Sequence, residues 1–244
     1  MELSVVIPVL NEAGNIEPLL EEIHAVLEGV CEFEVVYVDD GSSDETPRQL
    51  NDAKARYARL RVVTHQRPCG QSSALRSGIK AARGTWIATL DGDGQNDPRD
   101  IPRLLEIARE AAAEGRRVMA AGYRRKRQDS FIKRISSRIA NGVRSRLLGD
   151  ATPDTGCGLK VFAREAFLDM PYFDHMHRFL PALMQRGGGS VVSSEVNHRH
   201  RHTGSSKYGT LDRLIVGVVD LFGVMWLQRR ASRPVYTEKG DALE

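Results

Sequence analysis

The stretch "WIATLDGDGQNDP", residues 86–98, sets a largely apolar run directly before two carboxylates and a carboxamide, those of Asp91, Asp93 and Gln95. An apolar run that ends among glycines and acids predicts a buried strand followed by a polar turn. Residues 98–112 then carry apolar side chains at helical spacing. This unit of strand, turn and helix indicates how the rest of the chain is organised.

The first 122 residues alternate short apolar runs with longer amphipathic runs. Strands are expected at Leu3–Val9, Glu34–Val38, Arg61–Thr64, Trp86–Leu90 and Val118–Ala121, and helices near 14–28, 45–58, 71–82 and 98–112. This alternation predicts an α/β fold with a mainly parallel, Rossmann-like sheet and helices on both faces. Ligands of such sheets bind beyond the carboxyl ends of the strands, so "PVLNE", "DDGSSDET" and "DGDGQ" should meet in one crevice.

Composition narrows the class of protein. The 244 residues, 41% hydrophobic and 27% charged, suit one large globular domain or a domain with an appendage. Cys31, Cys69 and Cys157 are far apart and lack CxxC pairing, which argues against a disulfide framework and fits a reducing, cytosolic setting. The first residues lack the basic region of a signal peptide, so export is not expected.

The polar turns admit several interpretations. "DDGSSDE" has a structural one, a turn at Gly41 and a helix cap at Ser42 or Ser43. In the acidic turn, an EF-hand would need glycine in place of Asn96 and glutamate in place of Pro102. A phosphatase-type aspartate is expected after the first strand, and neither GxGxxG nor a P-loop is present. What remains is a Mg²⁺ or Mn²⁺ site of hard oxygen donors, open toward a diphosphate.

Six motifs in order resemble family 2 glycosyltransferases of the GT-A fold, in particular dolichyl-phosphate mannose synthase and related polyprenyl-phosphate glycosyltransferases. Between about residues 3 and 228 they are "VVIPVLNE", "VVYVDDGSSDET", "CGQSSALRSGIKAARG", "ATLDGDGQNDP", "DTGCGLKVFAREAF" and "HRHRHTGSSKYG". The resemblance implies a GT-A fold and an inverting transfer of a sugar from GDP-mannose or a UDP-sugar. The implied acceptor is an undecaprenyl or dolichyl-type phosphate.

The resemblance also implies roles for single residues. The nucleotide is expected against Pro8, Asn11, Glu12, Asp39, Asp40 and Asp91. Mg²⁺ or Mn²⁺ is expected on Asp91, Asp93 and Gln95, where it would stabilise charge on the leaving diphosphate. Arg201 and Lys207 would reach the diphosphate, and Asp154 would lie near the acceptor and sugar, so the expected catalytic residues are Asp93, Asp154, Arg201 and Lys207. The alternating His198, His200 and His202 suggest zinc ligands, but Arg199 and Arg201 would repel a cation.

Residues 116–146 carry eleven Lys and Arg against one acid, although the formal net charge is only +3. Within this run, 129–149 has an apolar stripe at helical spacing, with Arg144 among the basic residues elsewhere on the wheel. This pattern predicts a basic amphipathic helix on an anionic membrane surface, or else an ordinary solvated helix. The resemblance assigns the acceptor phosphate to Arg124, Arg134 and Ser137, with Lys133 or Arg138 as alternatives to Arg134. A phosphate monoester is already an anion at neutral pH, with a pKa near ~6, so no catalytic base is required.

The C-terminal residues add a helix. Residues 211–229 are apolar at helical spacing but interrupted by Asp220, and they fall short of the ~20 residues that cross a bilayer. The predicted apolar face consists of Leu211, Leu214, Ile215, Val218, Phe222, Met225 and Trp226, with Arg213 and Asp220 opposite. The expected organisation is a GT-A catalytic domain at 1–210, a membrane-interface or docking helix at 211–229 and a polar tail at 230–244.

The expected partners follow from these assignments. They are a nucleotide-diphosphate sugar, a polyprenyl phosphate and the inner face of the cell membrane, with peripheral attachment from the cytoplasm and no nucleic acid. A transmembrane partner protein or a second copy of the chain remains an option for the C-terminal helix. Two alternatives stay open, a GT-A transferase with a glycan or protein hydroxyl acceptor and an inactive membrane-bound scaffold. The scaffold would predict lost metal ligands, whereas Asp91, Asp93 and Gln95 are present.

Overall fold

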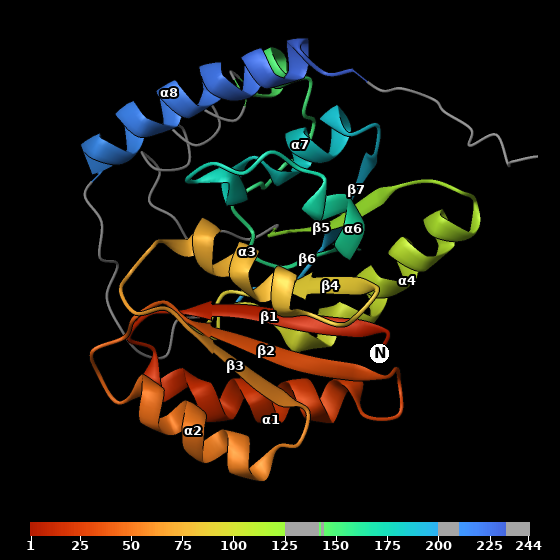
Figure 1. The fold of residues 1–244 in the computed structure, drawn as a ribbon. Helices are drawn as coiled ribbons and strands as arrows, with labels where there is room; N and C mark the ends of the chain where they lie inside the picture. Colours follow the sequence, from red (N-terminus) through yellow and green to blue (C-terminus); the bar gives the residue numbers. More distant parts are fainter. Residues whose placement is uncertain (125–141, 143, 200–209, 233–244) are drawn as a thin grey trace, which may run out of the picture.

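The chain was analysed as a computed structural model, which describes residues 1–124, 142, 144–199 and 210–232. Its centre is a seven-stranded sheet in the order β3-β2-β1-β4-β6-β5-β7 (Figure 1). β6 runs antiparallel to β4 and β5, and the other neighbouring pairs are parallel. The strands are β1 Leu3–Val9, β2 Phe33–Asp39, β3 Leu60–Thr64, β4 Trp86–Thr89, β5 Val118–Tyr123, β6 Lys160–Ala163 and β7 Ser190–Glu195.

All five predicted strands are confirmed, with ends that differ by at most two residues. The sequence pattern did not predict β6 or β7. β6 has only four residues, too few to show a period, and β7 is a largely exposed edge strand with three serines among its six residues. A mainly parallel sheet was therefore the correct expectation, with one antiparallel strand in its middle.

Helices cover both faces of the sheet. α1, α2 and α4 pack on one face, and α3, α6, α7 and α8 on the other (Figure 1). The helices are α1 Ile16–Leu27, α2 Thr46–Arg56, α3 Gln71–Ala81, α4 Ile101–Ala113, α6 Arg164–Leu168, α7 Leu180–Arg186 and α8 Thr210–Arg229. Short 3₁₀ turns, η1 Ala13–Asn15, η2 Pro98–Asp100 and η3 Met176–Arg178, precede α1, α4 and α7. The four predicted helices are confirmed, and two begin later because η1 and η2 occupy their first turns.

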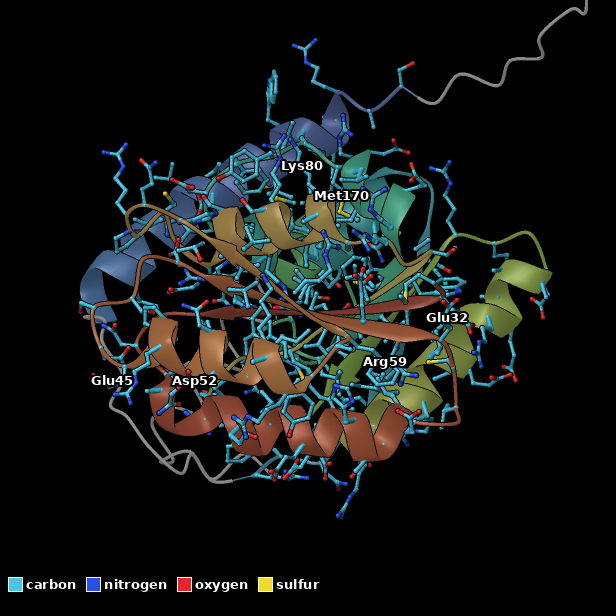
Figure 2. All side chains as sticks on the ribbon, turned by 60° about the horizontal axis from the view of Figure 1, so that its bottom comes forward. Glu32, Glu45, Asp52, Arg59, Lys80 and Met170 are labelled. Carbon is cyan, nitrogen blue, oxygen red and sulfur yellow. The ribbon has the colours of Figure 1, made fainter. Side chains whose placement is uncertain are left out.

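The strand period explains how two cores form. On β1, Val5 and Ile7 belong to the core beneath α1, α2 and α4, while Val6 belongs to the core beneath α3. Successive side chains of a strand point to opposite faces, so a strand buried on both sides is apolar throughout. Side chains fill both layers, and charged residues such as Glu45 and Asp52 lie at the outer surface (Figure 2).

α8 packs on α7, on the same side of the sheet as α3 (Figure 1). Val224 is fully buried, and Leu221, Met225 and Leu227 pack against the core. The opposite side exposes apolar residues instead, at Val218, Val219, Phe222 and Trp226. The prediction for Met225 was wrong, because this side chain faces the protein rather than the exposed stripe. No helix within the described residues has the length and hydropathy needed to cross a membrane.

Candidate active site

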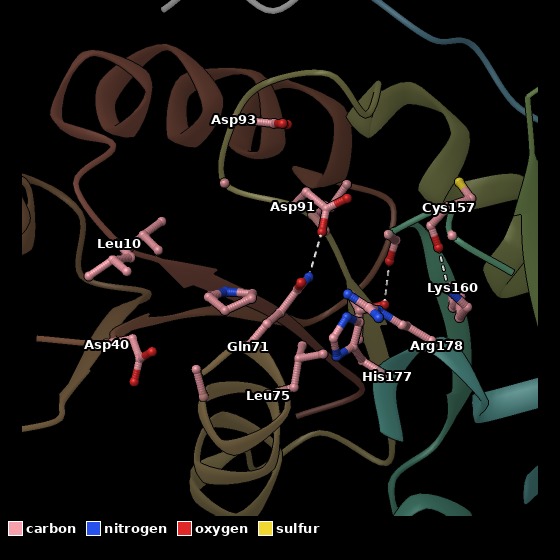
Figure 3. A pocket seen from close by; sticks show the side chains of 18 of the residues that line it. Leu10, Asp40, Gln71, Leu75, Asp91, Asp93, Cys157, Lys160, His177 and Arg178 are labelled. Carbon is pink, nitrogen blue, oxygen red and sulfur yellow. Dashed lines mark hydrogen bonds between the residues drawn. The ribbon is translucent and has the colours of Figure 1, made fainter. Parts of the chain in front are cut away.

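The carboxyl ends of β1, β2 and β4 border a cleft of about 500 Å³ (Figure 3). Because β6 is antiparallel, its first residue, Lys160, lies at the same edge of the sheet. The cleft is lined by six of the predicted donor and metal residues, Pro8, Glu12, Asp40, Asp91, Asp93 and Gln95. Strand order therefore brings together groups that are far apart in the sequence.

Asn11 and Asp39 instead organise the turn after β2. Ser42 N donates to Asp39 Oδ1 at 2.9 Å, and Ser43 N donates to Asn11 Oδ1 at 2.7 Å. Asn11 adopts a positive φ of 56°, a conformation that asparagine tolerates better than most residues. The interpretation of Ser42 or Ser43 as the cap of α2 was wrong, because Asp44 Oδ1 accepts from the backbone at the start of this helix. These contacts shape the wall nearest β1 and β2.

Asp40 is buried and has both carboxylate oxygens engaged. Oδ1 lies 2.6 Å from His65 Nδ1 and accepts from Cys69 N at 2.9 Å, while Oδ2 accepts from Gly70 N at 2.8 Å. The side chain thus ties the end of β2 to the loop that precedes α3. His65 follows β3 directly, so a rule that looks for polar residues at strand ends would have found it.

The turn after β4 gathers the predicted metal ligands. Gly94 has a φ of 73°, and Asp93 Oδ1 accepts from Gln95 N at 3.1 Å. Asp91 Oδ1 accepts from Gln71 Nε2 at 2.9 Å (Figure 3). Burial, followed by the charge of Asp93, raises the pKa of Asp91 to about 6. Two carboxylates that repel each other beside a carboxamide are chemically suited to a divalent cation, which relieves the repulsion.

The far side of the cleft contains residues that sequence reasoning missed. Lys160 is buried, and its Nζ donates to the carbonyls of Thr155, at 3.3 Å, and Cys157. Burial lowers the pKa of Lys160. The motif "DTGCGLK" contains this lysine and could have indicated it. Arg178 also lines the cleft (Figure 3), but no motif singled it out because η3 approaches from the second half of the chain.

His177, also from η3, presents a neutral ring to the cleft. Ser72 Oγ accepts from His177 N at 3.2 Å and lies 2.8 Å from Nδ1. Ser72 thus holds both the backbone and the imidazole ring of His177 against α3. Burial, with the nearby charge of Arg178, lowers the pKa of His177 to about 3. The ring is therefore uncharged at neutral pH.

The structure brings two of the predicted acceptor-side residues together. Arg124 Nε lies 2.6 Å from Asp154 Oδ2, and its Nη2 lies 2.9 Å from Oδ1. Arg134, Ser137 and Arg138 lie outside the described residues. A bidentate pair of this kind holds both side chains in fixed orientations.

His198 and Arg199, at the start of the motif "HRHRHTGSSKYG", lie beside the acidic turn. Arg199 N donates to Gln95 O at 3.0 Å, and His198 forms a bridge with Asn96. Arg199 pairs with Asp97 at 2.7 Å and with Glu22. The remaining residues of this motif, His200, Arg201, His202 and Lys207, lie outside the described residues.

The prediction that Arg144 belongs to the basic side of an amphipathic helix, toward a membrane surface or solvent, was wrong. Residues 144–148 are helical, but Arg144 points inward and is only 8% exposed. Its guanidinium contacts the carbonyl of Thr152 at 2.9 Å and lies 3.6 Å from Asp150 Oδ2. Arg146, two residues later, is exposed. A helical wheel shows which residues share a face, whereas burial depends on partners supplied elsewhere.

The sequence matches the family "Glycosyl transferase family 2" over residues 4–170. The chain belongs to this family. This family 2 glycosyltransferase is 37% identical to dodecaprenyl-phosphate galacturonate synthase of Rhizobium johnstonii, an alignment that covers 96% of the chain and 69% of the relative. It is 36% identical to undecaprenyl-phosphate 4-deoxy-4-formamido-L-arabinose transferase of Edwardsiella ictaluri, over 90% of the chain and 66% of the relative. The glycosyltransferase therefore spans about two thirds of the length of these relatives.

Solved structures agree on the fold. Glucosyl-3-phosphoglycerate synthase from Mycobacterium tuberculosis, in complex with Mn²⁺, UDP-glucose and phosphoglyceric acid, superposes with a TM-score of 0.65 at 18% identity. The match covers 95% of the glycosyltransferase and 81% of that chain. The same protein in complex with Mg²⁺ and UDP gives a TM-score of 0.65 over 95% and 80% of the two chains. The predicted GT-A fold is confirmed.

Proposed function

We propose that this glycosyltransferase moves a sugar, with inversion, from a nucleotide-diphosphate sugar to a polyprenyl phosphate at the cytoplasmic face of a membrane. The observation that carries the proposal is the cleft, in which Asp91 and Asp93 lie between the β1–β2 wall and Lys160. Both relatives described above are named for polyprenyl-phosphate acceptors, which supports the same acceptor class here. Their names specify different sugars, so the family alone does not select the donor.

Strand order suggests how the donor lies. The nucleoside is proposed along the ends of β1 and β2, beside Pro8, Glu12 and Asp40, with Asn11 and Asp39 supporting that wall from behind. The diphosphate would then reach the end of β4, and the sugar would extend toward the start of β6. GDP-mannose and UDP-sugars both fit this order of groups.

A divalent cation is proposed on the acidic turn. Asp91, Asp93 and Gln95 would hold Mg²⁺ or Mn²⁺, in keeping with hard oxygen donors and with the raised pKa of Asp91. When bound, the cation supplies positive charge where the diphosphate leaves. Arg201 and Lys207, which follow Arg199 in the sequence, are proposed to add positive charge near the diphosphate, because Arg199 N donates to Gln95 O.

The acceptor phosphate is proposed to need no general base. Its anion attacks directly, and His177, whose pKa is lowered to about 3, is poorly suited to remove a proton. Arg124, Arg134, Ser137 and Arg138 are the proposed acceptor ligands. Arg124 is already oriented by Asp154, so Asp154 would act on the acceptor side by aiming this guanidinium.

Membrane attachment is proposed through α8. Its exposed stripe, Val218, Val219, Phe222 and Trp226, is 46–64% accessible and ends beside the exposed Arg229 and Arg230. Asp220 faces the protein instead, with Oδ2 3.4 Å from His175 Nδ1. The apolar residues point outward, the acid points inward, and the arginines lie at the end of the stripe. This arrangement suits the headgroup region of an anionic bilayer. Alternatively, a transmembrane partner protein or a second copy of the chain would cover the exposed stripe of α8.

The test is transfer in vitro. Labelled GDP-mannose, UDP-glucose and UDP-galacturonate are each incubated with the protein and undecaprenyl phosphate in detergent, with Mg²⁺, Mn²⁺ or chelator. The expected result is one labelled lipid product, formed only with a divalent metal. Transfer to a free glycan instead would favour the hydroxyl-acceptor alternative, and nucleotide-sugar binding without transfer to any acceptor would favour the scaffold.

A further inference from the structure

Arg144 is a buried cation to which the proposed reaction assigns no role. It belongs to the helical residues 144–148, on which Arg146 is exposed, yet its side chain is only 10% accessible. It does not line the cleft. A buried charge is costly unless it is paired, so its contacts should indicate what it does.

The guanidinium contacts three residues of one loop, 150–158. Nη2 donates to the carbonyl of Thr152 at 2.9 Å and lies 3.6 Å from Asp150 Oδ2, and Nη1 donates to Thr155 Oγ1. Asp150 is fully buried and accepts from Thr152 N at 2.9 Å, which braces the same turn. Among the described residues, Arg144 Nε has no hydrogen-bond partner. Packed apolar residues would stabilise the fold at lower cost, which points to orientation of the loop as the role of this charge.

Two other buried or largely buried cations hold the same loop. Arg124 binds Asp154 through two nitrogens, and Lys160 donates to the carbonyls of Thr155 and Cys157. Three cations from three separate parts of the chain, the end of β5, the helical residues 144–148 and the start of β6, therefore converge on a segment of nine residues, 150–158. Such convergence fixes the path of a backbone that has no regular structure of its own.

The held loop forms the wall of the cleft beyond Asp91. Thr155, Gly156 and Cys157 line the cleft, and Thr89 Oγ1 donates to Gly158 O at 2.6 Å. Gly158 packs directly on the acidic turn, since a Cβ at this position would lie 2.3 Å from Asp91 Oδ2. Displacement of the loop would therefore change both the shape of the sugar end and the support of Asp91.

We propose that Arg144 is a positioning residue, which sets loop 150–158 against Asp91 without contacting either substrate. This role deepens the proposed function, because the wall that the loop forms is the one assigned above to the sugar. The hydrogen bonds and the ion pair of Arg144 within the described residues all go to loop 150–158 and not to the nucleotide wall at β1 and β2. Loss of Arg144 should thus reduce turnover while nucleotide affinity is kept.

The test compares Arg144→Gln, Arg144→Lys and the matched control Arg146→Gln, all in detergent. Arg144→Gln should lower kcat ten- to hundredfold with less than a twofold change in the Kd for UDP or GDP in the presence of Mn²⁺. Arg144→Lys, which retains the charge, should recover at least a third of the lost turnover. Arg146→Gln should match the wild type. Wild-type kcat in Arg144→Gln, or equal losses in Arg144→Gln and Arg146→Gln, would overturn the proposal.

Amide hydrogen exchange of peptides that contain residues 150–158 provides a readout independent of the acceptor. Exchange there should be at least tenfold faster in Arg144→Gln, and unchanged in Arg146→Gln, even if no polyprenyl phosphate is used. This separates failure of the positioning role from failure of the proposed function. If Arg144→Gln does not fold, Asp150→Asn, which keeps the bond from Thr152 N, serves instead. Faster exchange and lower kcat in Asp150→Asn would support the proposal, and unchanged values would overturn it.

Discussion

The cleft has one wall built from turns at the ends of β1 and β2, and another built from loop 150–158. On the first wall, side-chain oxygens of Asp39 and Asp40 accept hydrogen bonds from backbone N–H groups of the adjoining turns. On the second, long cationic side chains such as Arg124 and Arg144 arrive from other elements to hold the loop. Carboxylates that accept from backbone N–H groups need no second charge, whereas a buried guanidinium depends on each of its partners.

Substitutions at the two walls should therefore differ in whether they change activity alone or activity and stability together. Where a side chain binds the ligand and does not support the fold, its loss should reduce activity and leave the free energy of unfolding unchanged. Where it holds a wall, activity and stability should fall together. The acidic turn belongs to the first kind, since Asp93 bonds only the backbone of its own turn among the contacts described.

The largest effect is expected for Asp93→Asn. Loss of one carboxylate charge from the proposed metal site should lower kcat/KM by about a thousandfold, roughly 4 kcal/mol, because the cation stabilises the leaving diphosphate. Gln95→Ala should act in the same direction with a smaller loss. The free energy of unfolding, measured in urea, should change by less than ~0.5 kcal/mol. The exposed Asp52→Asn on α2 is the control, and full turnover of the wild type in chelator would contradict the metal assignment.

The second largest effect is expected for Gly158→Ala, which adds a methyl group to loop 150–158 and should lower stability. In Gly158→Ala the new Cβ would lie 2.3 Å from Asp91 Oδ2, so the loop or the carboxylate must move. We expect a loss of roughly 3 kcal/mol in the free energy of unfolding, as for overpacked cores, together with reduced Mn²⁺ affinity. Gly156→Ala is the matched control, because its nearest neighbours lie at 3.5 and 3.6 Å. Equal stability of the two variants would mean that the loop does not press on Asp91.

The two faces of α8 should respond in opposite ways. Val224→Ser removes a fully buried side chain and should cost about 2 kcal/mol of unfolding free energy. Phe222→Ser, at a position 61% exposed, should leave stability unchanged and weaken binding to anionic vesicles about tenfold. Vesicle sedimentation and urea denaturation measure the two effects. Unaltered vesicle binding, with dissociation of an oligomer instead, would assign the stripe to a second copy of the chain.

The smallest effect concerns pH and Asp91. Its pKa is raised to about 6 in the folded protein, mainly by burial, against ~3.9 in an unfolded chain. The folded state therefore binds this proton more tightly, so stability falls as pH rises from ~4 to ~6 and then levels off. In chelator, Asp91→Asn should be more stable than the wild type by roughly 1–2 kcal/mol at pH 7.5, with no difference below pH 4. Mn²⁺ should raise the stability of the wild type alone.

The sequence by itself determined the strands β1 to β5, the mainly parallel sheet and the place of the carboxylates of the acidic turn at a strand end. Asp91, Asp93 and Gln95 were identifiable because an apolar run ends where they begin, and strand ends of a parallel sheet share one edge. These inferences depend on residues close together in the chain, where periodicity and turn chemistry act locally.

Only the tertiary structure decided which faces of the later helices are covered. Arg144 turns inward and Arg146 outward although both belong to one basic run, and Asp220 of α8 faces the protein while Phe222 is exposed. The placement of the His177 ring likewise depends on Ser72, which comes from α3. Helical spacing specifies which side chains share a face. The partners that bury a face, or pair a charge within it, come from distant parts of the chain and exist only in the folded protein.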